Sequence, residues 1–129
     1  MKSPLRIAIA DRSALAHNVY KMLLKPLGFS LFHYKTLRDL KENLNFKWGC
    51  DCFLINSNTF GNHLDRHFEW FKKEPSLESI HKIFLCEPAE KKIQSQLKVL
   101  PHSHFVLKPF YPASLEETLN AVMSDKESV

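Results

Sequence analysis

The 129-residue chain contains 44% hydrophobic and 25% charged residues, values typical of one globular domain with a single core. Its formal net charge of +4 is mild, and no dense stripe of Lys and Arg with interleaved aromatic residues indicates nucleic-acid binding. No window approaches the roughly 18–20 apolar residues of a membrane span, and the first residues lack the apolar run of a signal peptide. We therefore expect one cytoplasmic domain over residues 1–129 without membrane association.

The first apolar segment, residues 5–10, predicts a strand that ends at Asp11. Ser13 is a favourable N-cap for the helix that follows. The apolar residues of this helix recur at spacings of three and four, and we expect four of them to face the core: Leu15, Val19, Met22 and Leu23. Residues 25–28 contain a proline and a glycine, which end the helix.

The next segments lead to the most apolar strand. Residues 29–34 predict a short strand, and Thr36 is expected to cap a helix that runs to about residue 46. Beyond a turn at residues 48–50, residues 51–56 hold four consecutive apolar residues with no charge among them, which predicts a strand buried on both faces. A polar loop follows Asn56. Open α/β sheets carry their chemistry at the carboxyl ends of strands, so this loop is a candidate site.

The second half of the chain continues the alternation of helix and strand. Helices are expected from Leu64, Pro88 and Ser114, strands at residues 83–86 and 105–107, and a polar tail from about residue 124. Strand and helix thus alternate five times. This pattern predicts a parallel sheet with helices on both faces.

Several of these segments resemble parts of response-regulator receiver domains (CheY-like). Residues 6–13 are similar to the first strand of that family, residues 51–56 to its third strand, and Lys108-Pro109-Phe110 to the motif after its fifth strand. The resemblance extends from about residue 5 to 123. It implies a flavodoxin-like three-layer α/β fold with strand order 2-1-3-4-5, and a cis peptide bond between Lys108 and Pro109.

The chain departs from the family at the residues that carry phosphorylation. The resemblance places Asn56 where receivers have the phosphoacceptor aspartate, and an amide is not a nucleophile for phosphoryl transfer. Of the two acids that hold a divalent metal in the family, Asp11 is present and Arg12 replaces the second. Cys86 stands at the position of a hydroxyl residue, and Lys108 is retained.

Two further positions complete this degenerate phosphorylation pocket. Glu87 replaces the small residue that follows the hydroxyl in the family, so that Asp11 and Glu87 balance Arg12 and Lys108 without a metal ion. We therefore expect no metal and no cofactor. The aromatic residue that moves on activation in the family corresponds to Phe105, which lacks a tyrosine's hydroxyl and is expected to stay fixed by packing.

The surface of the fourth and fifth helices is the expected partner face. Lys91, Lys92 and Lys98 make the fourth helix basic, and Tyr111 adds a side chain of the kind enriched at protein interfaces. Receivers usually meet their partners on this side.

The remaining histidines and cysteines are not assigned to a functional site. His63 and His67 have a spacing that can bind a metal, but no further ligand is evident, and a solvated helix face is the preferred interpretation. His102 and His104 are expected at the surface. The three cysteines, Cys50, Cys52 and Cys86, are expected to be reduced thiols.

The sequence favours a stand-alone pseudo-receiver, a non-enzymatic signalling domain of a bacterial two-component-type pathway that acts by protein–protein contact and independently of phosphorylation. One alternative is a small-ligand or cofactor-binding protein on the same fold, although few glycines and no phosphate-cradling loop count against it. Another is a basic nucleic-acid-binding regulator, which would show steep salt dependence. Homodimerisation is left open.

Overall fold

The structure is a computed structural model that describes residues 5–44 and 50–127, with side chains through residue 124. Within these residues, no helix combines the length and the apolar composition that crossing a membrane requires. The predicted end of the second helix near residue 46 and the turn at residues 48–49 lie outside the described residues.

Five parallel strands form one sheet in the order β2-β1-β3-β4-β5. This order confirms the predicted flavodoxin-like α/β fold. The strands are β1 (Arg6–Ala10), β2 (Ser30–Tyr34), β3 (Cys52–Asn56), β4 (His81–Cys86) and β5 (Ser103–Leu107). β3 lies at the centre and is buried along its whole length, as its uninterrupted apolar sequence predicts.

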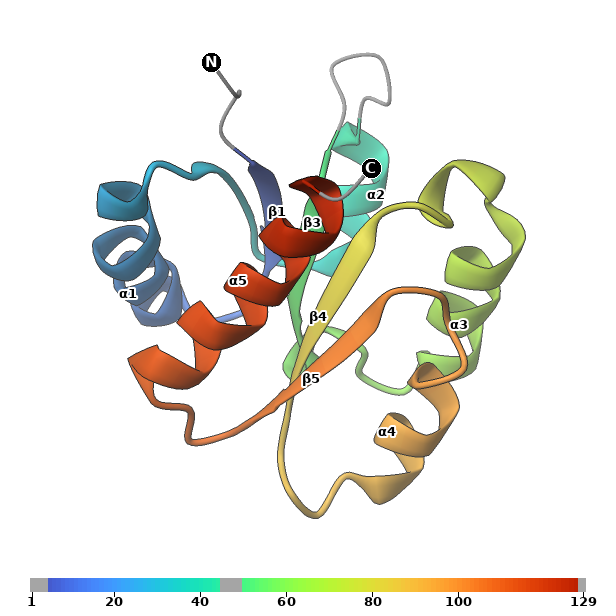
Figure 1. Cartoon of the computed structure of the whole chain (residues 1–129). Helices are drawn as coiled ribbons and strands as arrows, with labels where there is room; N and C mark the ends of the chain where they lie inside the picture. Colours follow the sequence, from blue (N-terminus) through green and yellow to red (C-terminus); the bar gives the residue numbers. More distant parts are fainter. Residues whose placement is uncertain (1–4, 45–49, 128–129) are drawn as a thin grey trace.

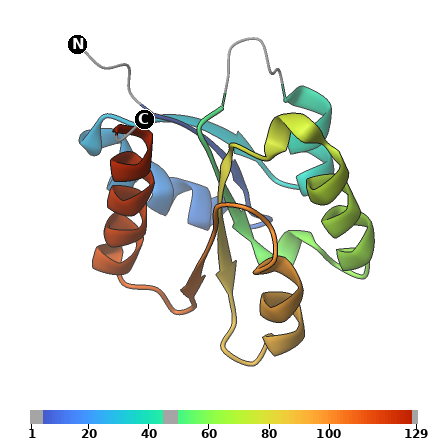
Figure 2. The same ribbon diagram turned by 45° about the vertical axis from the view of Figure 1, so that its right-hand side comes forward.

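Helices cover both faces of the sheet (Figures 1 and 2). α1 (Ala14–Leu24) and α5 (Pro112–Glu127) lie on one face, and α2 (Leu37–Asn43), α3 (Leu64–Lys73) and α4 (Lys91–Leu97) on the other. Three short 3-10 helices follow α1, β3 and α3: η1 (Lys25–Leu27), η2 (Ser57–Thr59) and η3 (Pro75–Leu77). The helix expected from Ser114 starts two residues earlier, at Pro112, and extends beyond residue 124, where a polar tail was expected to begin.

Alternate residues of the strands supply two separate cores. Ile7, Ile9 and Leu54 point toward α1 and α5, whereas Ala8 and Phe53 point toward α2 and α3. This division follows from the period of two along a strand, which sends successive side chains to opposite faces. All three cysteines are buried free thiols, as expected.

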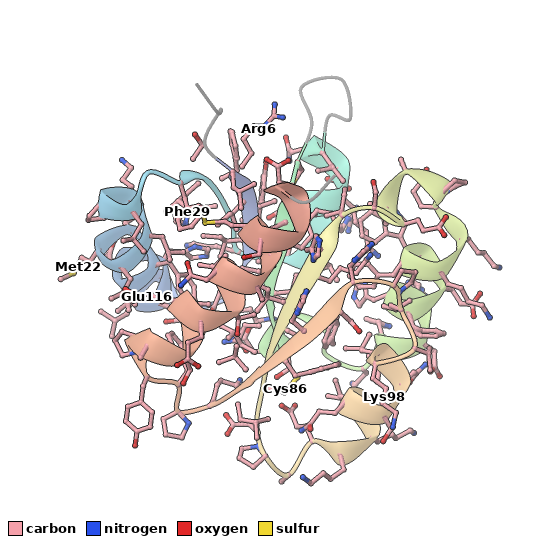
Figure 3. The ribbon with its side chains drawn as sticks, in the orientation of Figure 1. Arg6, Met22, Phe29, Cys86, Lys98 and Glu116 are labelled. Carbon is pink, nitrogen blue, oxygen red and sulfur yellow. The ribbon has the colours of Figure 1, made fainter. Side chains whose placement is uncertain are left out.

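The predicted inward face of α1 is wrong for three of its four residues; the fourth, Leu23, is partly buried and packs against the core. Leu15 and Met22 are 74% and 76% exposed, and Val19 is also exposed, while the helix buries Tyr20 and Leu24. In Figure 3, the Met22 side chain points away from the body of the protein.

Polar contacts explain the rotation of α1. His17 Nε2 lies 2.8 Å from the backbone carbonyl oxygen of Asp11, and the Tyr20 hydroxyl donates a hydrogen bond of 2.7 Å to the Asp11 carboxylate. Both side chains therefore face the sheet. The buried ring of Tyr20 also stacks on Phe110, with centroids 6.3 Å apart. An apolar pattern around much of a helix does not identify the buried side when amphipathic residues have partners there.

Candidate functional site

The candidate site lies where the carboxyl ends of β1, β3, β4 and β5 meet. Parallel register aligns these ends: Ala10 is opposite Ile55, Asn56 opposite Leu85, and Cys86 opposite Leu107. Asp11 and Lys108 follow directly after β1 and β5, so residues far apart in the sequence come together. The Lys108–Pro109 peptide bond is cis, as the resemblance implied.

Asp11 is a fully buried carboxylate with four hydrogen-bond donors. Oδ1 accepts from the Ser13 backbone N–H at 2.9 Å and from Asn58 Nδ2 at 3.1 Å. Oδ2 accepts from the Tyr20 hydroxyl at 2.7 Å and from Asn56 Nδ2 at 3.0 Å. Burial acts to raise the pKa of Asp11, but the four donors favour the charged form and hold the pKa below its ordinary value. Asp11 is thus a satisfied anion.

Asn56 connects this anion to Lys108. Its side chain is 8% exposed; Nδ2 donates to Asp11, and Oδ1 accepts from Lys108 Nζ at 2.8 Å and from the Asn58 backbone N–H at 3.0 Å. An amide is suited to this position because it offers a donor to the acid and an acceptor to the ammonium. Both ends of the Asn56 amide are therefore used within the protein.

Two glutamates border the other side of Lys108. Lys108 Nζ lies 3.4 Å from Glu87 Oε1 and 3.4 Å from the Ser57 hydroxyl. Glu90 Oε1 accepts from the Ser57 hydroxyl at 2.8 Å and from the Glu87 backbone N–H at 2.6 Å. These contacts tie the polar loop after β3 to the loop after β4.

Arg12 does not join this network through its side chain. Its backbone N–H donates to Asn58 Oδ1 at 3.2 Å, while its guanidinium Nη2 lies 3.9 Å from the position that a Cβ would take at Gly61. The sequence-based charge balance included Arg12. In the described residues, the cation that contacts the candidate site is Lys108, and the Arg12 guanidinium lies over the loop between η2 and α3.

Cys86 and Phe105 lie beside the network and pack into the α2–α4 side of the core. Cys86 is labelled at the end of β4 in Figure 3, and burial raises the pKa of its thiol to about 11, so the thiol is protonated at neutral pH. Phe105 packs on Phe84 with ring centroids 5.7 Å apart. That Phe105 stays fixed remains a prediction.

The residues of the expected partner face are exposed on α4 and after β5. Lys91, Lys92 and Lys98 are solvent-accessible, and Tyr111 is 74% exposed. A cavity of about 400 Å³ lies next to Tyr111, between β5 and the start of α5. The use of this face for binding stays a prediction.

The histidines differ in part from expectation. His63 is exposed, but His67 is buried and its Nδ1 lies 2.8 Å from Lys41 Nζ, so the predicted solvated face is wrong for His67. His102 is exposed, whereas His104 is half-buried and its Nε2 lies 3.0 Å from Nδ1 of His81. In the part of the chain that the structure describes, no three His, Cys, Asp or Glu side chains are arranged to hold a metal ion.

Two residues of the network were not identified from the sequence: Tyr20 and Glu90. Ser57 and Asn58 belong to the polar loop after Asn56 that was expected as a candidate site, but their contacts were not predicted. The Asn-x-Asn spacing was an available signal for Asn58, because an asparagine side chain often accepts from the N–H two residues later. Tyr20 and Glu90 had no such signal. The rotation of α1 brings Tyr20 to the site, and the approach of the loop after β4 to the loop after β3 brings Glu90.

The sequence matches no protein-family model and no curated protein. Solved structures are similar in fold. They include a CheY-like response regulator receiver domain protein from Methanospirillum hungatei, with a TM-score of 0.76, 18% identity, and coverage of 98% of this chain and 98% of that one. The chain has a receiver-domain fold.

Two further neighbours support the same fold. A response regulator receiver domain from Clostridium thermocellum has a TM-score of 0.72 and 19% identity, covering 95% of this chain and 97% of that one. The signal receiver domain of an HD domain-containing protein from Pseudomonas fluorescens has a TM-score of 0.68 and 15% identity, covering 100% and 96%. Within this fold, Asn56 and its neighbours hydrogen-bond to one another, and β3 ends without a carboxylate nucleophile.

Proposed function

We propose that this chain is a signalling domain of a bacterial two-component-type pathway that acts through contact with a protein partner and is not phosphorylated at Asn56. The observation that carries the proposal is the engagement of both ends of the Asn56 amide, by Asp11 at 3.0 Å and by Lys108 at 2.8 Å. A phosphoryl group would need a carboxylate at that position, and it would compete with Asn56 for Lys108.

The proposed partner face, which we call the α4–β5–α5 face, consists of Lys91, Lys92, Lys98 and Tyr111. Three exposed ammonium groups provide long-range attraction to an acidic partner, and a 74% exposed tyrosine provides an amphipathic anchor. β5 lies at the edge of the sheet, so the groups on this side are accessible to another chain.

The first test is chemical. The purified protein is incubated with a small phosphodonor and beryllofluoride, and intact mass and fluorine NMR report any adduct. We expect neither an aspartyl-phosphate-type mass increase nor a saturable beryllofluoride signal. A stoichiometric phosphoryl adduct on the wild-type chain would contradict the proposal.

The second test concerns the partner. Proteins from the source cell are captured with the wild type, with Lys91→Glu/Lys92→Glu/Lys98→Glu, and with a control that reverses three exposed lysines elsewhere, Lys21→Glu/Lys25→Glu/Lys35→Glu. Because both triple variants change net charge equally, we expect a partner retained by the wild type and the control and lost by the α4 variant. Equal capture by all three proteins would rule out the α4–β5–α5 face as the contact.

A further inference from the structure

A cavity of about 420 Å³ lies between α2 and the loop that leads from η2 into α3. It is distinct from the hydrogen-bonded network around Asn56. Leu37 and Phe60 supply apolar lining, and six basic side chains line the rest: Arg12, Arg38, Lys41, His63, Arg66 and His67. Its volume is within the range of about 300–1,000 Å³ common for small-molecule sites.

The positive charge of this cavity has little internal compensation. No Asp or Glu lines it. Arg38 pairs with Glu42 at 3.0 Å on the exposed side of α2, but Arg12, Lys41 and Arg66 form no ion pair among the described residues. Like charges at a partly enclosed site repel one another more strongly than in bulk water. An anion that entered would relieve this repulsion.

Two of the basic side chains show the effect of this environment. Burial lowers the pKa of Lys41, and the neighbouring Arg66 lowers it further. Burial, Lys41, His63 and Arg66 lower the pKa of His67 to about 4. Neutral His67 can accept a hydrogen bond from Lys41 at 2.8 Å, and Lys41 also lies 4.7 Å from the centroid of the Trp70 ring. Lys41 is therefore held in position at the cavity wall.

Gly61 lies next to the Arg12 side chain at the cavity. Its φ of +54° is in the region that favours glycine, and the Arg12 guanidinium lies 3.9 Å from the position of a Cβ there. Arg12 thus brings its charge from the end of β1 to a wall otherwise formed by α2 and α3. Planar guanidinium groups such as those of Arg12 and Arg66 suit bidentate binding of phosphate oxygens.

We propose that this cavity binds a small molecule through a phosphate or pyrophosphate group. The cationic walls match the negative charge of phosphate groups, while Leu37 and Phe60 are buried beneath the cavity and support its floor. Two contacts connect the cavity to the candidate site: Arg12 N–H donates to Asn58 at 3.2 Å, and the Thr59 hydroxyl donates to the Asn56 carbonyl at 2.8 Å. Ligand binding would thus supply an input that needs no phosphorylation.

Calorimetric titration in phosphate-free buffer tests the proposal with ADP, pyrophosphate and adenosine as probes. We expect saturable one-to-one binding of ADP or pyrophosphate, and none of adenosine. Arg12→Gln/Arg66→Gln removes two exposed charges from the walls and should weaken binding about tenfold or more. The control Lys21→Gln/Lys25→Gln removes the same charge from exposed positions outside the cavity and should leave the dissociation constant within about twofold.

Equal affinity for ADP and pyrophosphate would assign recognition to the phosphates, and tighter ADP binding would add contacts to the base; both results support the proposal. Absence of saturable binding of both anions at millimolar concentration would overturn it. Equal weakening by the two double variants would also overturn it, because the binding would then reflect net charge alone.

An amide NMR titration gives the location independently. With three glycines in the chain, the Gly61 and Gly28 signals are readily distinguished. Gly61 lines the cavity, which lies beyond the carboxyl ends of the strands, whereas Gly28 precedes β2 and lies at the amino ends of the strands. On titration with ADP or pyrophosphate, we expect the Gly61 signal to shift and to give the same dissociation constant as calorimetry. The Gly28 signal should stay unchanged. A saturable shift of Gly28 without Gly61 would place the ligand elsewhere and refute the assignment.

Discussion

The side-chain amide of Asn56 donates a hydrogen bond of 3.0 Å to the buried carboxylate of Asp11. The residue at the end of the central strand therefore contributes a donor where the resembled family has a second acid. Because Asp11 is ionised and fully buried, its environment depends on this donor. The chemistry of position 56 and the stability of the site are linked.

Asn56→Asp is expected to destabilise the protein by about 2–4 kcal/mol at neutral pH, because it places a second carboxylate against Asp11. The loss should shrink as the pH falls toward about 4, where the two acids can share a proton. Urea unfolding at several pH values measures both effects. The exchanged pair, Asp11→Asn/Asn56→Asp, restores one amide and one carboxylate and should recover most of the stability. No recovery would show that charge repulsion is not the cause.

Asn56→Asp alone is also expected to gain no Mg²⁺ or beryllofluoride binding. Mg²⁺ requires near-octahedral oxygen coordination, and in this variant both oxygens of Asp11 would still accept hydrogen bonds from Ser13, Asn58 and Tyr20. Position 12 supplies no second acid. Isothermal titration measures Mg²⁺ binding by Asn56→Asp and by Asn56→Asp/Arg12→Asp. We expect Mg²⁺ to bind the double variant and not the single variant. Saturable Mg²⁺ binding by Asn56→Asp alone would show that one added acid is enough.

The outward face of α1 should tolerate polar substitution. Leu15 and Met22 are 74% and 76% exposed, so Leu15→Ser and Met22→Ser should each change the free energy of unfolding by about 0.5 kcal/mol or less. Leu24 is fully buried, and Leu24→Ala should cost about 2–5 kcal/mol. Chemical denaturation of the three variants compares them directly. A large loss for Leu15→Ser would mean that this face is covered in solution.

Acid should weaken the fold through His33 and His67. Burial and the nearby His17, Lys21 and Lys25 lower the pKa of His33 to about 4, and burial with Lys41, His63 and Arg66 lowers the pKa of His67 to about 4. In the unfolded chain both imidazoles bind a proton near pH 6.5. The unfolded state then holds more protons between about pH 6.5 and 4, so the free energy of unfolding falls as the pH falls through that window.

The expected loss is about 1–2 kcal/mol for each histidine, because both groups retain some contact with solvent. Urea unfolding near pH 7 and near pH 5 measures it for the wild type and for His33→Gln/His67→Gln. The glutamines keep hydrogen-bonding capacity but do not titrate, so this variant should lose less stability on acidification. The same slope in both proteins would assign the pH dependence to other groups.

The sequence by itself determined the order of elements and the residue types at the carboxyl ends of the strands. The uncharged apolar run at residues 52–55 predicts a strand covered on both faces, and five alternations of strand and helix leave few topologies. Asn56, Cys86 and Lys108 follow from this reasoning, because a strand fixes where its last residue lies. Such patterns are local, and they can be recognised along the sequence because the burial of apolar residues follows the period of each element.

The tertiary structure alone decided where polar side chains find partners. Lys82 is fully buried in β4 because its ammonium donates to the carbonyl oxygens of Leu77, Ile80 and Pro101 at 2.7–3.0 Å. α1 turns Tyr20 inward because Asp11 accepts its hydroxyl. The basic cavity joins Arg12 to residues from α2 and α3. Hydrogen bonds and charge clusters link positions far apart in the chain, and they have no period along the sequence that could reveal them beforehand.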